Sequence, residues 1–328
     1  MKYVFGPVPS RRLGQSLGID PVPLKTCNWN CVYCQLGRTR PLTNVRKQFF
    51  PPGDVINQLK EALASHKPGE IDWITFVGSG ETMLNASVGW LICEIKQLTR
   101  IPVAVITNGS LLYLPEVRQD LAVADAVLPS LDAGNSDLYK RINRPHPDLT
   151  FKSLIDGLKI FRKEYDKKLW VEVMLVRDLN DSEVALREIA LLLEDIKPDE
   201  VHLVLPTRPP VEPWVKPPNE EGLLRARAIL GDIAKIINPV SGSFDLSGTD
   251  NLMDAIIGII TRHPMREEEL TETLSKWSPD NVAEILEKLG KSGKAQVVKR
   301  YRVNFWTASP AYFPGSNRAD EKVNERSV

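Results

Sequence analysis

Apolar and polar positions recur along the chain with two different periods. Short apolar runs rich in β-branched residues predict six strands, at 17–25, 71–77, 101–107, 124–131, 169–176 and 199–205. Amphipathic segments between them predict helices, most clearly at 52–66, 149–165 and 182–196. Strands that are apolar throughout and alternate with helices are typical of a parallel sheet covered by helices. The pattern therefore predicts an α/β fold, an open, partial (β/α)6 barrel over residues 1–237.

The pattern changes in the last quarter of the chain. Residues 238–251 are rich in Gly, Ser and Asp and predict a linker. Helical spacing returns at 252–264, 266–277 and 278–293, and residues 294–308 alternate as a hairpin does. Three helices followed by a two-stranded wing predict a small winged-helix-like domain at 252–314. We expect the polar residues 315–328 to be a disordered tail.

The charges of this expected domain bear on its partners. Its third helix carries Asp280, Glu284 and Glu287, which argues against DNA reading by that helix. The expected wing is basic and aromatic, with Lys294, Lys299, Arg300, Arg302, Tyr301, Phe305 and Trp306. A wing contact to RNA or to an acidic protein therefore stays open, beside a role in packing or dimerisation in which the aromatics are core.

Charge and hydropathy narrow the class of protein. The chain has 42 Lys and Arg against 42 Asp and Glu, which argues against a protein that coats nucleic acid. Its N-terminus does not resemble a signal peptide, and its most apolar stretch, 253–264, is too short to span a bilayer. We expect no membrane contact and a reducing, cytoplasmic setting. Clustered cysteines in that setting are more often metal ligands than disulfides.

Three of the four cysteines lie within eight positions of one another. Cys27, Cys31 and Cys34 follow a C-x3-C-x2-C spacing, whereas Cys93 lies far away in a helical pattern and is expected to be a small buried hydrophobe. Three thiolates on one loop suit a [4Fe–4S] cluster with one iron open to an outside ligand. The alternative is a zinc site completed by a distant histidine.

The cysteine spacing resembles the signature of the radical S-adenosylmethionine (SAM) superfamily, and Tyr33 directly before the last cysteine fits the same pattern. The resemblance implies a [4Fe–4S] cluster whose open iron chelates the amino and carboxylate groups of SAM. Reductive cleavage of SAM then releases a 5′-deoxyadenosyl radical. It also implies that Tyr33 packs near the adenine and that the site lies at the carboxyl ends of the barrel strands.

Further candidate residues follow the predicted strands. The Gly78-Ser79-Gly80-Glu81 stretch looks like the superfamily's glycine-rich motif, which holds the amino group of SAM, although the usual pattern is closer to G-G-E-P. Its glycines allow a ligand to approach the backbone closely, and a plain strand-to-helix turn is the alternative. The resemblance implies that SAM is also contacted by residues at later strand ends, namely Asn108, Ser130, Asp132, Arg177 and Asn180. For Asp132, a helix N-cap is the rival role.

Three charged residues outside these motifs are candidates as well. Glu172 lies inside a predicted strand, where a carboxylate facing the barrel lumen is costly without a partner. It is either a ligand of SAM or substrate, or the partner of an arginine in the lumen. Arg12 and Arg208 lie in loops that should reach the open face of the barrel, and both are candidate substrate contacts. The alternative is that they are solvated residues of an ordered lid.

Within the superfamily, "FGPVPSRRLGQSLGID" and "LYKRINRPHPDLTF" look like a group of iron–sulfur oxidoreductases that is similar to wyosine-type tRNA-base synthases. The chain lacks the cysteines of their second cluster, which argues against the same ring closure. We expect an oxygen-sensitive radical SAM enzyme with ferredoxin or flavodoxin as reductant and an unidentified substrate, with RNA one candidate. The alternative is a SAM- or redox-responsive regulator that acts through the winged-helix domain.

Overall fold

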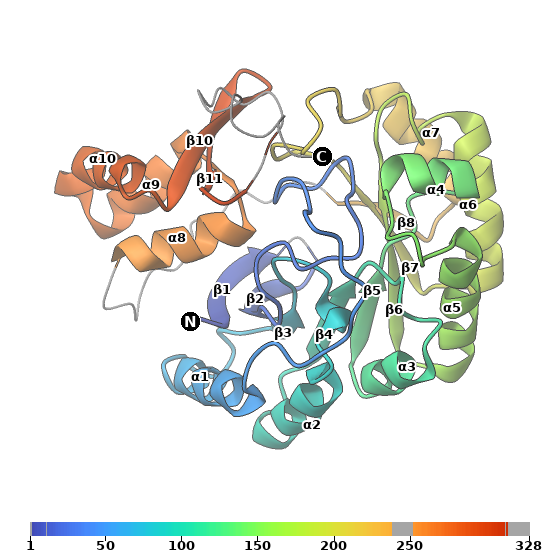
Figure 1. The fold of residues 1–328 in the computed structure, drawn as a ribbon, viewed down its shortest axis with the longest axis horizontal. Helices are drawn as coiled ribbons and strands as arrows, with labels where there is room; N and C mark the ends of the chain where they lie inside the picture. The colour runs from blue at the N-terminus through green and yellow to red at the C-terminus, as the bar shows by residue number, and fades with distance from the viewer. Residues whose placement is uncertain (1, 11, 238–251, 312, 314–328) are drawn as a thin grey trace, which may run out of the picture.

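The computed structural model describes residues 2–10, 12–237, 252–311 and 313. An eight-stranded sheet forms its centre, and the strands lie in chain order from β1 to β8 (Figure 1). All pairs are parallel except β1 with β2, which are antiparallel. The strands are β1 (Val4–Ser10), β2 (Gly14–Ile19), β3 (Trp73–Phe76), β4 (Val103–Thr107), β5 (Ala126–Pro129), β6 (Lys168–Met174), β7 (Glu200–Val204) and β8 (Ala234–Ile236).

Seven α-helices connect these strands and lie along the outer side of the curved sheet (Figure 1). They are α1 (Pro52–Ala64), α2 (Val88–Leu98), α3 (Pro115–Ala122), α4 (Ser136–Ile142), α5 (Phe151–Glu164), α6 (Glu183–Ile196) and α7 (Glu220–Leu230). Between the described strands, no pairing joins β8 back to β1, so the sheet is open. The predicted α/β fold is confirmed, and the mostly parallel sheet is consistent with a partial barrel.

The sheet has two strands more than the periodicity predicts. The first, β1, contains Pro7 and Pro9, which usually argue against a strand, but an edge strand tolerates proline because one side of it needs no ladder. Its pairing with β2 is irregular between Phe5 and Val8, on either side of Pro7. The other, β8, has only three residues, too few to show a period.

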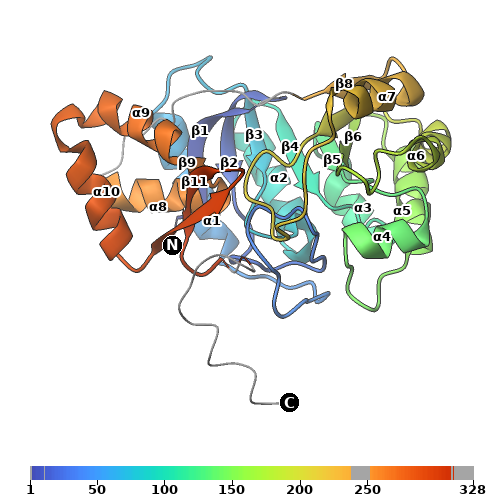
Figure 2. The ribbon, with the colours of Figure 1, turned by 90° about the horizontal axis from the view of Figure 1, so that it is seen from above.

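The predicted small domain covers the residues that we call the C-terminal segment, 252–313. The predicted helices are present as α8 (Leu252–Arg262), α9 (Glu267–Trp277) and α10 (Val282–Lys291), and the hairpin as β10 (Ala295–Arg300) and β11 (Val303–Ala308). A short strand, β9 (Met265–Arg266), pairs with β11 and was not predicted. The segment has its own apolar core and lies beside β1, at one edge of the sheet (Figure 2).

Two further predictions have different outcomes. Cys93 is exposed and not buried, because α2 packs inward through Val88, Leu91, Ile92 and Ile95 and carries Cys93 on its outer face. The expected linker 238–251 and tail 315–328 lie outside the described residues, so the domain boundaries stay predictions. None of the described helices is long and apolar enough to cross a membrane.

Candidate functional site

The three clustered cysteines lie on a loop that follows β2, which we call the cysteine loop (residues 25–37). The loop pairs with the end of α4, because the Asn30 N–H donates to the Asn143 carbonyl at 3.0 Å and the Val32 N–H to the Ile142 carbonyl at 2.9 Å. Trp29 is buried and packs edge-on against Tyr139, with ring centroids 5.4 Å apart. Backbone pairing and aromatic packing thus fix the loop against α4.

Each of the three thiols has a nitrogen donor of its own. The Trp29 N–H lies 3.4 Å from Cys27 Sγ, Asn143 Nδ2 lies 3.7 Å from Cys31 Sγ, and Lys25 Nζ lies 3.1 Å from Cys34 Sγ. Hydrogen bonds to cysteine sulfurs are among the features that tune iron–sulfur clusters. All four cysteines of the chain are free thiols. The donors and the three thiols fit the ligand set of a cluster.

Burial keeps the thiols of Cys27 and Cys31 protonated unless a cation binds them. Desolvation raises the pKa of Cys27 to about 12, and desolvation together with the neighbouring thiols and Asp132 raises the pKa of Cys31 well above its usual value. Binding of iron must therefore displace protons from this loop. No group of three or more His, Cys, Asp or Glu in the described ranges is arranged to hold a single metal ion, so the geometry gives the zinc alternative no support. A cluster binds each thiolate through a different iron.

The stretch Gly78–Glu81, which we call the glycine loop, follows β3 and lies directly against the cysteine loop. The Lys25 N–H donates to the Ser79 carbonyl at 2.6 Å, and the Glu81 N–H to the Thr26 carbonyl at 2.8 Å. A Cβ atom on Gly80 would fall 1.8 Å from the Thr26 carbonyl oxygen. Only glycine allows this approach, so the two loops form one unit.

Glu81 joins the ends of β3 and β4. Its carboxylate accepts hydrogen bonds from the Met83 N–H at 2.9 Å, the Thr107 hydroxyl at 2.5 Å and the Asn108 N–H at 2.7 Å. Desolvation raises its pKa, while these donors lower it. The Asn108 side chain in turn donates to Asn28 Oδ1 of the cysteine loop at 2.7 Å. Glu81 and Asn108 thus tie two strand ends to the cysteine loop.

Asp132 closes the other side of the site. Its Oδ2 accepts from the Tyr33 hydroxyl at 2.5 Å and from Asn143 Nδ2 at 2.7 Å, and its Oδ1 from the Met174 N–H at 2.8 Å. Its pKa is raised by desolvation. Asn180 is fully buried and donates to the Asp132 carbonyl at 2.8 Å. A helix N-cap was the alternative role for Asp132, but the residue that caps α4 is Asn135.

A cavity of about 350 Å³ opens beside these residues in the barrel lumen. Tyr33 and Cys34 form part of its wall, as do Arg12, Glu172 and Arg208. Arg12 and Glu172 form an ion pair, which is the alternative foreseen for Glu172. The Arg208 guanidinium donates to Gln35 Oε1 at 3.2 Å, next to Cys34. Both candidate substrate arginines therefore line one cavity that reaches the cysteine loop.

Two of the candidates need separate mention. Ser130 forms a β-bridge with Glu172 at the end of β5, near the cavity wall. Arg177 is exposed and lines a different hollow, together with Arg141, Arg144 and Trp214. The structure therefore brings together the cysteines, the glycine loop, Asn108, Asp132 and the lumen residues, but leaves Arg177 outside.

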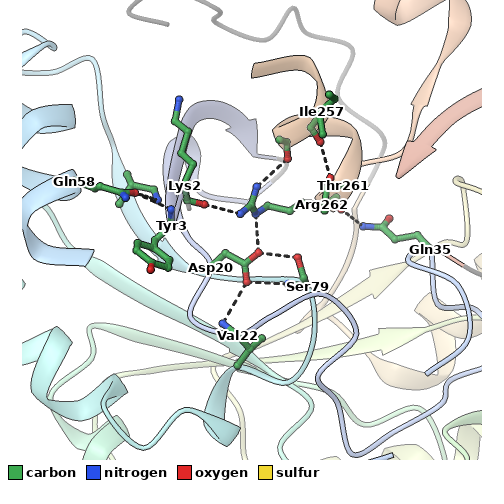
Figure 3. A network of polar contacts seen from close by, with 12 residues as sticks. Lys2, Tyr3, Asp20, Val22, Gln35, Gln58, Ser79, Ile257, Thr261 and Arg262 are labelled. Carbon is green, nitrogen blue, oxygen red and sulfur yellow. Dashed lines mark hydrogen bonds and ion pairs between the residues drawn. The ribbon is translucent and has the colours of Figure 1, made fainter. Parts of the chain in front are cut away.

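Several site residues were missed by sequence reasoning. Asn28 and Asn143 hold the loops described above, and their only signal was a position beside a motif. Asp20 follows β2 directly, so its place at a strand end was a usable signal. Arg262, at the end of α8, contacts Asp20 across 242 positions, and nothing in the local sequence indicates it (Figure 3).

Comparison with known proteins places this chain in a family. The model described as "Radical SAM superfamily" matches residues 22–189. The UPF0026 protein MJ1312 of Methanocaldococcus jannaschii is 35% identical over 90% of this chain and 92% of its own length. A protein named GTPase Obg, from Brachyspira hyodysenteriae, is 42% identical over 90% of this chain, but the match spans only 43% of that protein.

One solved structure supports the fold. A radical SAM methyltransferase from Sphaerobacter thermophilus matches with a TM-score of 0.51 and 21% identity, covering 67% of this chain and 66% of that one. At this identity the likeness concerns the arrangement of the sheet and helices.

Proposed function

The chain belongs to the radical SAM superfamily, whose members are enzymes that use a [4Fe–4S] cluster and SAM; we propose that it uses them to abstract hydrogen from a small substrate bound in the lumen cavity. The observation that carries this proposal is that the cysteine loop forms part of the cavity wall, because its residues Tyr33 and Cys34 line the cavity. Radical chemistry needs the substrate next to the place where the radical forms.

The residues divide into distinct roles. Cys27, Cys31 and Cys34 would hold the cluster, which with SAM supplies a 5′-deoxyadenosyl radical. The SAM contacts we propose are Tyr33, the glycine loop, Asn108, Ser130 and Asp132. Much of the acceptor capacity of Glu81 and Asp132 is already used within the protein. Their main effect is therefore to hold the strand ends that surround SAM in one geometry.

The cavity suggests the kind of substrate. Its volume of about 350 Å³ suits a small molecule or a single nucleoside-sized group. Arg12 and Glu172 form an ion pair within the wall, and Arg208, which also lines the cavity, is the candidate contact for an acidic group. An RNA substrate has weaker support, because Lys299 and Arg302 of the hairpin share their surface hollow with Glu267, Glu268 and Glu272.

Other expectations remain proposals of the same kind. Members of the superfamily typically need a reductant, and we propose a ferredoxin or flavodoxin for this chain, acting in the cytoplasm. The helices and hairpin of the C-terminal segment have the order of a winged helix, and that assignment stays a prediction. The regulator alternative predicts SAM binding without turnover.

Narrowing the cavity tests the proposal. We expect Val204→Phe, which adds a ring at the end of β7, to lower substrate-stimulated formation of 5′-deoxyadenosine by about tenfold or more, because overpacking a lined cavity displaces its ligand. The stimulus is a cell extract divided into a small-molecule and an RNA fraction, and the assay is anaerobic.

The matched control is Val184→Phe on the exposed face of α6, which should behave as wild type. Iron content should be equal in all three proteins. Stimulation by the RNA fraction alone, or stimulation that Val204→Phe leaves intact, contradicts a small substrate in this cavity.

A further inference from the structure

The end of α8 in the C-terminal segment reaches into the barrel. Its last residue, Arg262, is only 8% exposed, and its guanidinium lies against the Phe5 ring at 4.6 Å. The guanidinium donates to the Gly258 carbonyl at 2.9 Å and to the Lys2 carbonyl at 3.1 Å. Three of its neighbours are thus one aromatic ring and two backbone carbonyl oxygens. The fourth is a carboxylate, and Figure 3 shows this contact.

That carboxylate belongs to Asp20, which is 3% exposed and follows β2 directly. Arg262 Nε donates to Asp20 Oδ2 at 2.7 Å. A buried ion pair of this kind is costly to break, because removal of one partner leaves the other charged and desolvated. Barrel and C-terminal segment are therefore joined by a charged contact at one defined point.

Asp20 passes this contact on to the glycine loop. Its Oδ2 also accepts from the Ser79 hydroxyl at 2.7 Å, and its Oδ1 accepts from the Ser79 N–H at 3.0 Å. A Cβ atom on Gly78 would fall 2.1 Å from Asp20 Oδ1, so the loop backbone lies directly on this carboxylate. A single carboxylate thus holds both Arg262 and the middle of the glycine loop.

The same helix end also touches the cysteine loop. Gln35 Nε2 donates to the Arg262 carbonyl at 3.1 Å, and Gln35 follows Cys34 directly. Gln35 Oε1 accepts from Arg208, and His263, the next residue after Arg262, lines the same cavity. The end of α8 therefore contacts the cysteine loop directly and the glycine loop through Asp20, and His263 beside it lines the cavity.

We propose that Arg262 is a positioning residue for SAM: through Asp20 it fixes the glycine loop, and it makes the C-terminal segment part of the active site. This inference rests on the proposed function, because it assigns the glycine loop to SAM. Arg262 itself touches neither SAM nor substrate in this account. Its effect is to hold Ser79 and its neighbours where SAM meets them.

The test compares Arg262→Gln with Arg266→Gln, the same change at an exposed arginine of the same segment. We expect Arg262→Gln to raise the dissociation constant of SAM about tenfold, the size expected for losing one charge-assisted hydrogen bond, while turnover at saturating SAM changes little. Arg262→Lys should restore part of the affinity. Hydrogen exchange of the iron-free protein should show faster exchange over residues 77–82 in Arg262→Gln alone.

Two results would overturn the positioning role of Arg262. A folded Arg262→Gln protein with wild-type SAM affinity and unchanged exchange at 77–82 overturns the proposal. If Arg262→Gln does not fold, the double variant Asp20→Asn with Arg262→Gln, which removes both charges, takes its place and should show the same weaker SAM binding. A wild-type protein that carries iron but binds no SAM instead refutes the proposed function, and the positioning role with it.

Discussion

Replacing Cys31 by alanine is expected to abolish both iron binding and SAM cleavage. The three thiols are the only ones on the cysteine loop, and each has its own nitrogen donor. Two remaining thiolates leave a second iron without a protein ligand, so the cluster is lost and not merely weakened. We expect the anaerobically reconstituted variant to lack the visible absorption of an iron–sulfur protein and to form no 5′-deoxyadenosine.

The chain offers its own control for this experiment. Cys93 is exposed on α2, away from the cysteine loop, so Cys93→Ala should keep wild-type iron content and activity. Wild-type iron content in Cys31→Ala would mean that the cysteine loop does not hold the cluster.

The second large effect is expected from a single methyl group. In Gly80→Ala, the new Cβ would lie 1.8 Å from the Thr26 carbonyl oxygen, so the glycine loop must move away from the cysteine loop. Displacement of a positioned group by about 1 Å costs on the order of a hundredfold in rate. We expect Gly80→Ala to bind SAM more weakly and to lose about a hundredfold in activity, measured by equilibrium dialysis and by 5′-deoxyadenosine formation.

Gly53→Ala is the matched control, because a Cβ on Gly53, in the first turn of α1, meets no atom within 4 Å. This variant should keep wild-type SAM affinity. If Gly80→Ala also binds SAM as wild type does, the glycine loop is not part of the SAM site.

Much of the barrel could be read from hydrophobic periodicity, because its strands are apolar on both faces and its helices are amphipathic. Each of the strands β2 to β7 overlaps one of the apolar runs that were predicted to be strands. The strand β1 escaped because Pro7 and Pro9 argue against a strand, and only its place at the sheet edge makes them tolerable. Cys93 was misplaced because an apolar residue in a helical pattern does not by itself tell which face it occupies.

The site was predictable as far as its residues form motifs. The cysteine spacing and the glycine loop are local patterns, and the structure brings them into direct contact. The contact between Arg262 and Asp20 depends on how a separate segment docks on the barrel. Glu172 shows the same limit, because its need for a partner was clear from its strand position, whereas the choice of Arg12 came only from the fold.

The central claim is that Cys27, Cys31 and Cys34 hold a cluster that cleaves SAM, and one anaerobic assay tests it most directly. The protein is reconstituted with iron and sulfide, given SAM and dithionite, and assayed for 5′-deoxyadenosine beside Cys31→Ala and Cys93→Ala. We predict product with the wild type and with Cys93→Ala, and none with Cys31→Ala. Product that persists in Cys31→Ala, or a wild-type protein that holds its cluster and binds SAM yet forms none even with cell extract present, would contradict the account.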